Sequence, residues 1–199
     1  MIIYYTHIIK SKGDENVNWT LPGTVLSIDL EREESAEEVF TAMFLTGGLV
    51  LSQVTQVTGL EPYIVQNWVR RGFLPPPQQR KYTRRQFSRI LTINALKSAL
   101  SIEQLCRLLS YINGALDDEG DDMIDDTQLY FLFVKLAARM RELYAPQEAE
   151  EMLDQYLQSY QEPVAGAKER VRQVLRIMLT AWLSARMMQS AADMLQQLP

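Results

Sequence analysis

The chain has 199 residues and a formal net charge of −5, with 47% hydrophobic and 23% charged residues, the balance of an ordinary globular protein. A single cysteine, Cys106, and a single histidine, His7, exclude a disulfide framework, a Cys/His zinc site and a Cys–His catalytic pair. No basic residue precedes the apolar start, and glycines and polar side chains interrupt the longest uncharged run, residues 41–60. We therefore expect neither a signal peptide nor a membrane span. The protein is expected to be cytoplasmic.

Residues 1–34 are expected to form an N-terminal extension that includes short strands. Residues 2–9 are rich in β-branched and aromatic side chains, and a Pro22-Gly23 turn follows further along. Beyond this extension the pattern is helical. Capping-box spacings start helices after Ser35, Thr83 and Ser101, and the sequence is expected to fold as a mainly α protein. The predicted helices cover residues 36–45, 49–57, 62–71, 84–99, 102–112, 129–143, 147–160 and 167–198.

Two of these helices, 49–57 and 62–71, are joined by a tight turn at Thr58-Gly59. Such a pair sets the second helix at a steep angle, from which it can enter a DNA major groove about 12 Å wide. Three prolines within residues 73–82 make the next segment a stiff loop with the length of a small wing. Helix 62–71 has an apolar face for burial, formed by Val65, Trp68 and Val69. Its opposite face is polar, and carries Tyr63, Gln66, Asn67 and Arg70.

Positive charge is concentrated in residues 61–97, where eight basic residues stand against the single acid Glu61, a net charge of +7. The basic residues are Arg70, Arg71, Arg80, Lys81, Arg84, Arg85, Arg89 and Lys97. An acidic protein with one cationic window commonly presents that window to a polyanion. A solvated basic face without a ligand is the alternative interpretation.

The segment from Thr58 to Tyr82 resembles the MerR family of winged helix-turn-helix proteins. The residues that carry the resemblance are Thr58, Gly59, Gly72, Leu74, Pro75, Pro76, Arg80 and Tyr82. The stretch from about Glu37 to Tyr130 resembles more closely an uncharacterised bacterial group of MerR-like proteins, a domain of unknown function. The resemblance covers about half of the chain and implies a MerR-like winged helix-turn-helix head at residues 35–114.

The resemblance implies sequence-specific binding of double-stranded DNA, with helix 62–71 in the major groove and a wing at 73–82 on the backbone. It assigns DNA contacts to Tyr63, Gln66, Asn67, Arg80, Lys81 and Tyr82. The polar face of helix 62–71 and the cationic window add Arg70, Arg71, Arg84 and Arg85 to the expected contacts. Arg89, next in the same cationic helix, is expected to contact phosphate as well. We expect no metal, no cofactor and no catalytic residue.

Residues 115–199 are expected to form an acidic linker and a helical region for effector binding or dimerisation. Residues 117–126 hold seven acids and no base, without the spacing of a calcium loop, and are predicted to be a solvated linker. In the last helix, apolar residues recur at three- and four-residue steps from Val171 to Leu195, a pattern that predicts a homodimer. A small-molecule effector is left open.

The leading hypothesis is a transcriptional regulator. The alternatives are an adaptor that binds protein through the helical C-terminal region, and an excisionase-like architectural DNA binder. An enzyme is not expected, because the sequence has no glycine-rich phosphate loop, no Ser/His/Asp set and no metal-ligand spacing.

Overall fold

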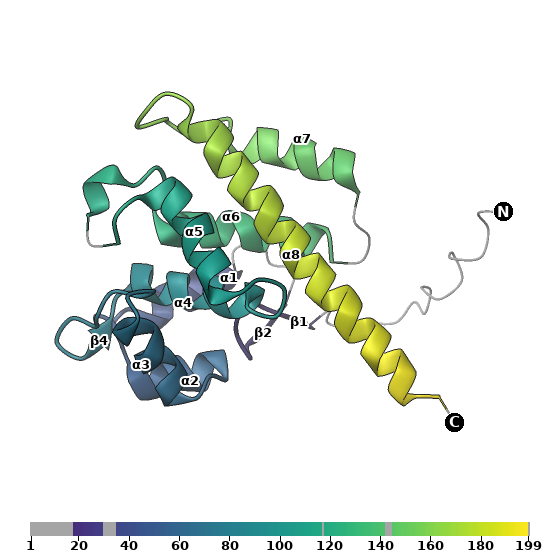
Figure 1. The fold of residues 1–199 in the computed structure, drawn as a ribbon, viewed down its shortest axis with the longest axis horizontal. Coiled ribbons are helices and arrows are strands. Elements are labelled where there is room, and N and C mark those ends of the chain that lie inside the picture. Colours follow the sequence, from purple (N-terminus) through teal and green to yellow (C-terminus); the bar gives the residue numbers. More distant parts are fainter. Residues whose placement is uncertain (1–17, 30–34, 117, 142–144, 199) are drawn as a thin grey trace.

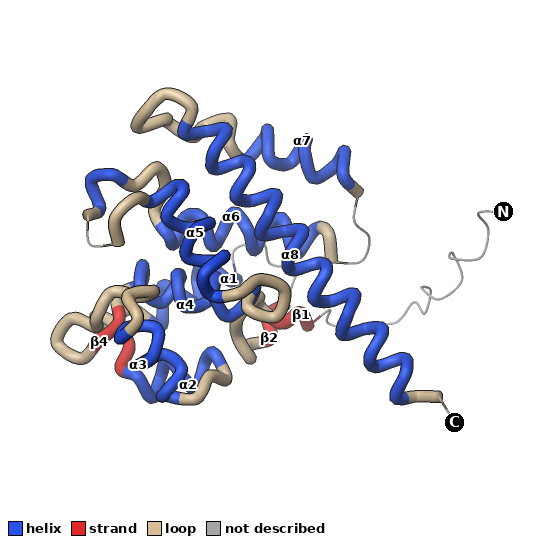
Figure 2. Tube along the Cα trace, in the orientation of Figure 1, coloured by secondary structure: helices blue, strands red, loops and turns tan. Residues whose placement is uncertain are grey.

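A computed structural model describes residues 18–29, 35–116, 118–141 and 145–198, and it confirms the mainly α class (Figure 1). Two small antiparallel sheets of two strands each accompany the helices (Figure 2). The strands are β1 (Asn18–Thr20), β2 (Ser27–Asp29), β3 (Leu49–Val50) and β4 (Lys81–Tyr82). The α-helices are α1 (Ser35–Met43), α2 (Leu51–Thr58), α3 (Pro62–Arg70), α4 (Arg84–Leu96), α5 (Ile102–Asn113), α6 (Asp126–Arg139), α7 (Pro146–Tyr156) and α8 (Ala167–Gln196). Within the described ranges, no helix is both long enough and apolar enough to span a membrane.

The N-terminal extension contains short strands, as predicted, in the form of the β1–β2 hairpin. Its loop enters the core: Leu21 is fully buried, and the Tyr130 hydroxyl donates a hydrogen bond to the carbonyl of Pro22 at 2.8 Å. Trp19 meets Trp182 of α8 edge to face, with ring centroids 6.3 Å apart. The strand-like residues 2–9 lie outside the described residues.

Two predicted capping boxes, at the starts of α4 and α5, are confirmed. The Thr83 and Ser101 hydroxyls accept hydrogen bonds from the backbone N–H groups of Gln86 and Gln104. In return, the backbone N–H groups of Thr83 and Ser101 donate to the side-chain Oε1 atoms of these two glutamines. Asp125 caps α6 through its carboxylate, which accepts hydrogen bonds from the backbone N–H groups of Thr127 and Gln128. A correction concerns residues 49–50, which were predicted to be helical. They form β3 and pair with β4, so α2 begins only at Leu51.

The acidic segment was predicted to be a solvated linker, but it packs in part against the rest of the protein. Ile124 and Asp126 are each only 3% exposed, and the backbone N–H of Met123 donates to the carbonyl of Ile112 at 2.8 Å. One continuous apolar core runs from the hairpin through α4 and α6 to α8. The apolar side chains of α6 therefore pack into the same core as the apolar side chains of the segment from α2 to α5.

Helix α8 crosses the other helices and then extends past them toward the C-terminus (Figure 1). Its buried residues are Ala167, Val171, Val174, Leu175, Met178, Leu179, Ala181 and Trp182. From Arg186 onward every described residue of α8 is exposed. The apolar stripe predicted from Val171 to Leu195 is therefore buried in its first half only.

Candidate nucleic-acid interface

The turn between α2 and α3 is fixed by local hydrogen bonds. The Thr58 hydroxyl donates to the carbonyl of Val54 at 2.8 Å and accepts from the N–H of Leu60 at 3.2 Å. Gly59 has a φ of 68°, a left-handed conformation that glycine adopts without strain. Pro62 then begins α3, at the position where a missing N–H costs nothing.

A second set of contacts, which sequence reasoning missed, joins this turn to the N-terminal hairpin and α4. The Asn94 amide donates to the carbonyls of Gly23 and Thr58, at 2.8 and 3.0 Å. The N–H of Val25 donates to the carbonyl of Val57 at 2.9 Å. The signal in the sequence was a single asparagine in the apolar second half of α4. These bonds hold α3 at a set orientation relative to α4.

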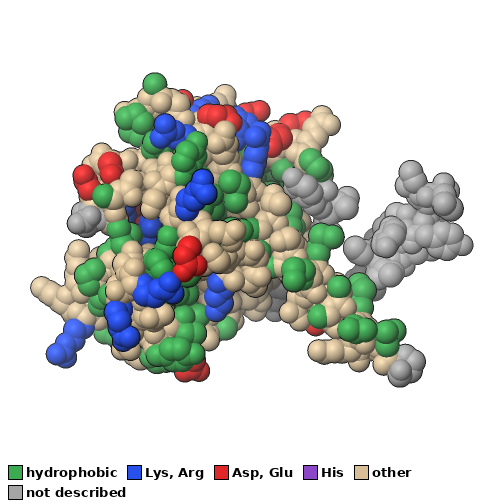
Figure 3. Space-filling model, viewed as in Figure 1, with side chains coloured by type: hydrophobic (Ala, Val, Ile, Leu, Met, Phe, Trp, Pro, Cys, Tyr) green, Lys and Arg blue, Asp and Glu red, His purple; other side chains and the backbone are tan. Residues whose placement is uncertain are grey.

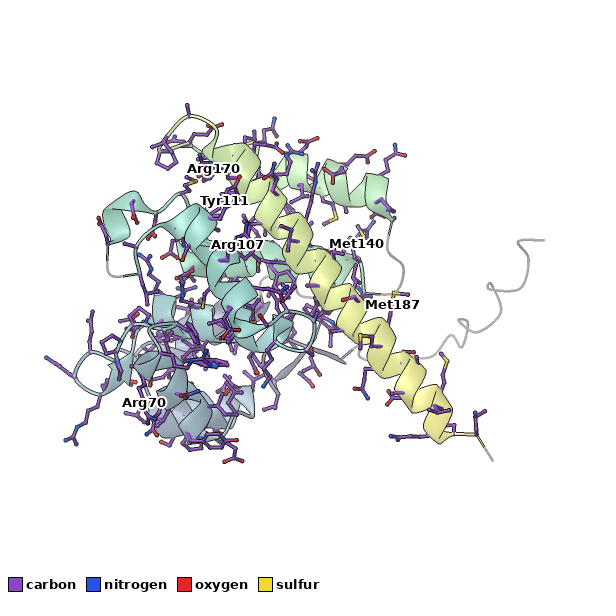
Figure 4. All side chains as sticks on the ribbon, viewed as in Figure 1. Arg70, Arg107, Tyr111, Met140, Arg170 and Met187 are labelled. Carbon is purple, nitrogen blue, oxygen red and sulfur yellow. The ribbon has the colours of Figure 1, made fainter. Side chains whose placement is uncertain are left out.

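Helix α3 has one buried and one exposed face, as predicted. Val65 is fully buried and Trp68 is 6% exposed, so the tryptophan is a core residue. On the outer face Tyr63 is 68% exposed, Gln66 and Arg70 are exposed and Asn67 is half-buried. In the part of the chain that the structure describes, no hydrogen bond or ion pair engages these four side chains. Arg70 is labelled on this helix in Figure 4.

The loop from α3 to β4 ends in a tight turn at residues 78–81. Gln79 and Arg80 have φ values of 48° and 65°, and the N–H of Lys81 donates to the carbonyl of Gln78 at 2.8 Å. This geometry is a type I′ turn, which strongly favours glycine or asparagine at its two central positions. The chain instead holds an exposed arginine there.

The remaining predicted loop residues differ in exposure. Lys81 is exposed, and its Nζ donates to the carbonyl of Thr46 at 3.3 Å. Tyr82 is only 3% exposed, and its burial raises the pKa of the phenol. It packs in the core and anchors the loop, so its ring is not on the surface that faces solvent.

Arg71, at the end of α3, is exposed but has partners on two sides. Its guanidinium pairs with Glu103 of α5 at 2.7 Å and lies 4.5 Å from the centroid of the Phe73 ring. Both ionic partners are well exposed, so this pair contributes little to stability. It nevertheless offsets part of the positive charge of Arg71.

The three arginines of α4 lie deeper than the sequence indicated. Arg84 is half-buried, with its guanidinium 5.6 Å from the centroid of the Phe131 ring. Arg85 pairs with Asp122 and approaches Asp126 at 3.6 Å. Arg89 is 5% exposed and donates to Asp126 at 3.3 Å. The expected phosphate contact of Arg89 is thus wrong, because its side chain is buried in an ion pair.

The outward positive charge is consequently smaller than the +7 of the sequence window. Asp122 and Asp126, from the acidic segment, engage Arg85 and Arg89. The exposed cations beside the outer face of α3 are Arg70, Arg71, Arg80 and Lys81. Figure 3 shows Lys and Arg side chains scattered over the face on which α3 and α5 lie, with an acidic side chain among them.

One acid works against an anion at the start of α3. Glu61 is the N-cap residue, is exposed, and makes no side-chain cap bond. The N-terminus of a helix attracts anions, and a carboxylate placed there cancels that attraction. Contact with a phosphate is therefore favoured at the C-terminal half of α3 and at the loop, not at Glu61.

Two surface pockets lie elsewhere, along α6. One of about 520 Å³ is bordered by Arg85, Asp122 and Tyr160, and one of about 620 Å³ by Glu37, Lys135 and Gln155. Neither borders α3 or the 78–81 turn.

Comparison with known proteins gives one match. Residues 49–133 match the protein-family model described as "Domain of unknown function (DUF1836)". No curated protein and no solved structure matches the chain. The matched residues begin at β3 and end within α6, so they include α3, the 78–81 turn and the acids that pair with Arg85 and Arg89. This part of the chain is therefore similar to a domain of unknown function.

Proposed function

We propose that the chain is a sequence-specific double-stranded DNA-binding protein, with a MerR-like winged helix-turn-helix head and a role in transcription regulation. In this proposal α3 enters the major groove, and the loop at residues 73–82 acts as a wing on the backbone. The observation that carries the proposal is the outer face of α3. Its polar side chains have no hydrogen-bond or ionic partner among the described residues, and they project beside an exposed arginine in a left-handed turn.

The chemistry of this face suits base recognition. Gln66 and Asn67 each carry an amide that can pair with adenine, and Arg70 can pair with guanine or a phosphate. Tyr63 is exposed enough to contact the backbone or a thymine methyl group. Because α3 lies on a rigid core through Trp68, these groups are held ready before DNA arrives.

The wing supplies contacts that do not depend on sequence. Arg80 and Lys81 lie at its tip, and Arg71 flanks it from α3. Tyr82 and Arg85 act indirectly, since one is buried and the other is paired with Asp122. Arg84 is half-buried, so only the exposed part of its side chain could reach DNA. We assign these three to positioning of the wing and α4.

The experiment is selection of bound sequences from a random duplex pool at two salt concentrations, followed by fluorescence anisotropy with the selected duplex. Four exposed cations predict that log K falls with log salt at a slope of about −3.6 per head. Arg80→Ala/Lys81→Ala should weaken binding to all duplexes and reduce this slope by about 1.8. Gln66→Ala or Asn67→Ala should instead change the preferred sequence.

The matched control is Lys135→Ala/Arg139→Ala, which removes the same charge from α6, where the two residues pair with Glu37 and Glu148. It should leave the slope unchanged. If the parent shows no salt-sensitive duplex binding, the proposal fails and the adaptor hypothesis takes its place. Strong DNA bending without sequence preference would favour the architectural alternative.

A further inference from the structure

The apolar surface of α8 changes direction at about Trp182. The buried residues of its first half lie on one side of the helix, toward the core. The exposed apolar residues of its second half lie elsewhere. With 3.6 residues per turn, their mean direction is rotated by roughly 150° from the core-facing side. The second half is therefore not a continuation of the stripe that packs in the core.

We define the distal α8 face as Met187, Met188, Ala191, Met194, Leu195 and Leu198. Its five large side chains are 64–73% exposed. The opposite side is polar throughout, and carries Arg186, Gln189, Ser190, Asp193, Gln196 and Gln197. Met187 is labelled on the stretch of α8 that extends past the other helices (Figure 4). Such a clean separation of apolar and polar residues is typical of a helix that buries one face against a partner.

We propose that the distal α8 face binds the same face of a second copy of this chain. The area agrees with this choice. Five large side chains that each lose on the order of 100 Å² give roughly 500 Å² per copy and 1,000 Å² for a pair, the lower bound for a specific interface. A two-fold pair reaches this area from one helical face, because the same patch is used twice.

The charge distribution also favours a second copy. Between residues 184 and 198 only Arg186 and Asp193 are charged, and both lie on the polar side. The face therefore has no charge to repel its own copy and none with which to recognise a charged partner. Ser184 and Ala191 are one heptad apart along its middle, where small side chains allow two helices to approach closely.

Self-association does not depend on the proposed DNA binding, but it would raise the affinity of that binding. One head with about four phosphate contacts binds weakly at physiological salt, and two linked heads multiply that affinity. Only the distal part of the apolar stripe predicted from Val171 to Leu195 is open to a second copy, because Val171, Val174 and Met178 are already buried within one chain.

The test is sedimentation equilibrium of the full chain without nucleic acid, from 1 to about 200 µM. The chain mass is 22.9 kDa, so a dimer has about twice that mass. Met188→Glu/Leu195→Glu should raise the dimer dissociation constant at least about 100-fold, since two charges would be buried on each side. The matched control, Gln189→Glu/Gln196→Glu, adds the same charge on the polar side and should change it less than about threefold.

Far-UV circular dichroism at low concentration shows whether the variants remain folded, and Met188→Ala provides a milder change with an intermediate effect. A parent that stays at the monomer mass at about 200 µM overturns the inference, as does a dimer that Met188→Glu/Leu195→Glu leaves intact. Protection of the distal α8 face from hydrogen exchange in a monomer, lost when residues 1–17 are removed, would also overturn it and assign the face to that segment. Because no DNA is present, none of these outcomes depends on the proposed function.

Discussion

Arg80→Gly should make the protein more stable and a weaker DNA binder at the same time. Arg80 has a φ of 65° at the second central position of a type I′ turn. This conformation costs an L-residue about 1–2 kcal/mol, which glycine does not pay. Glycine in turn loses about 0.4–1 kcal/mol more conformational entropy on folding. The net gain is roughly 0.5–1 kcal/mol, or about 1–4 °C in Tm for a chain of this size.

The effect on DNA binding follows from the lost charge. One phosphate contact fewer reduces the slope of log K against log salt by about 0.9. Between 50 and 200 mM salt this amounts to about a threefold change in the ratio of variant to parent Kd. The loss should be largest at low salt and the same for all duplex sequences.

Gln79→Gly is the matched control, because Gln79 has the same left-handed backbone, at a φ of 48°, but no charge. Its Tm should rise by a similar amount, and its slope of log K against log salt should equal that of the parent. Thermal melts and anisotropy titrations at four salt concentrations measure both quantities. If neither glycine variant raises Tm, the strain argument is wrong. If both variants keep the parent slope, Arg80 does not contact phosphate.

Three further predictions concern the head and its support. Glu61→Gln should lower the Kd for duplex about two- to tenfold, measured by anisotropy at low salt. It should also lower the free energy of unfolding by about 0.3–1 kcal/mol, because a favourable contact with the helix dipole is lost. An unchanged Kd would place the duplex away from the N-terminus of α3. Asp126→Ala should lower the free energy of unfolding in urea by about 3–5 kcal/mol, because Arg89 would stay buried without its ionic partner. Asp125→Ala, which removes only the helix cap, should lower it by about 1 kcal/mol. Equal losses would refute the buried-pair argument. Asn94→Ala should lower the free energy of unfolding by about 1–3 kcal/mol, since it leaves the part-buried carbonyls of Gly23 and Thr58 without this donor. Because it loosens the turn that orients α3, it should also raise the Kd for duplex more than Arg80→Gly does.

The helices could be predicted from the sequence because their signals are local. Capping boxes at Thr83 and Ser101, proline at position 62 and glycine at position 59 each act within a few residues, and all were confirmed. The two faces of α3 follow from helical periodicity for the same reason. Strand β3 was missed because two residues carry no periodicity, and its pairing with β4 is a long-range contact.

What the sequence could not provide was the partner of each charge. Arg85 and Arg89 look like a cationic face in the sequence, and Asp122 and Asp126 look like a solvated linker. In the fold these arginines and aspartates form ion pairs with low solvent exposure, so neither set contributes its full charge to the surface. Periodicity gives the side of a helix on which a residue lies, but not which distant segment covers that side.

The hairpin at residues 18–29 has a practical consequence for anyone who trims this protein. The match to the family model begins only at residue 49. A fragment that starts there would lose Trp19, Leu21 and the Gly23 carbonyl that accepts a hydrogen bond from Asn94. Phe40 would go too, and with it a fully buried ring that stacks on Tyr130. The stretch that matches the family model is thus shorter than the stretch that builds the core, and the longer of the two is the one to express.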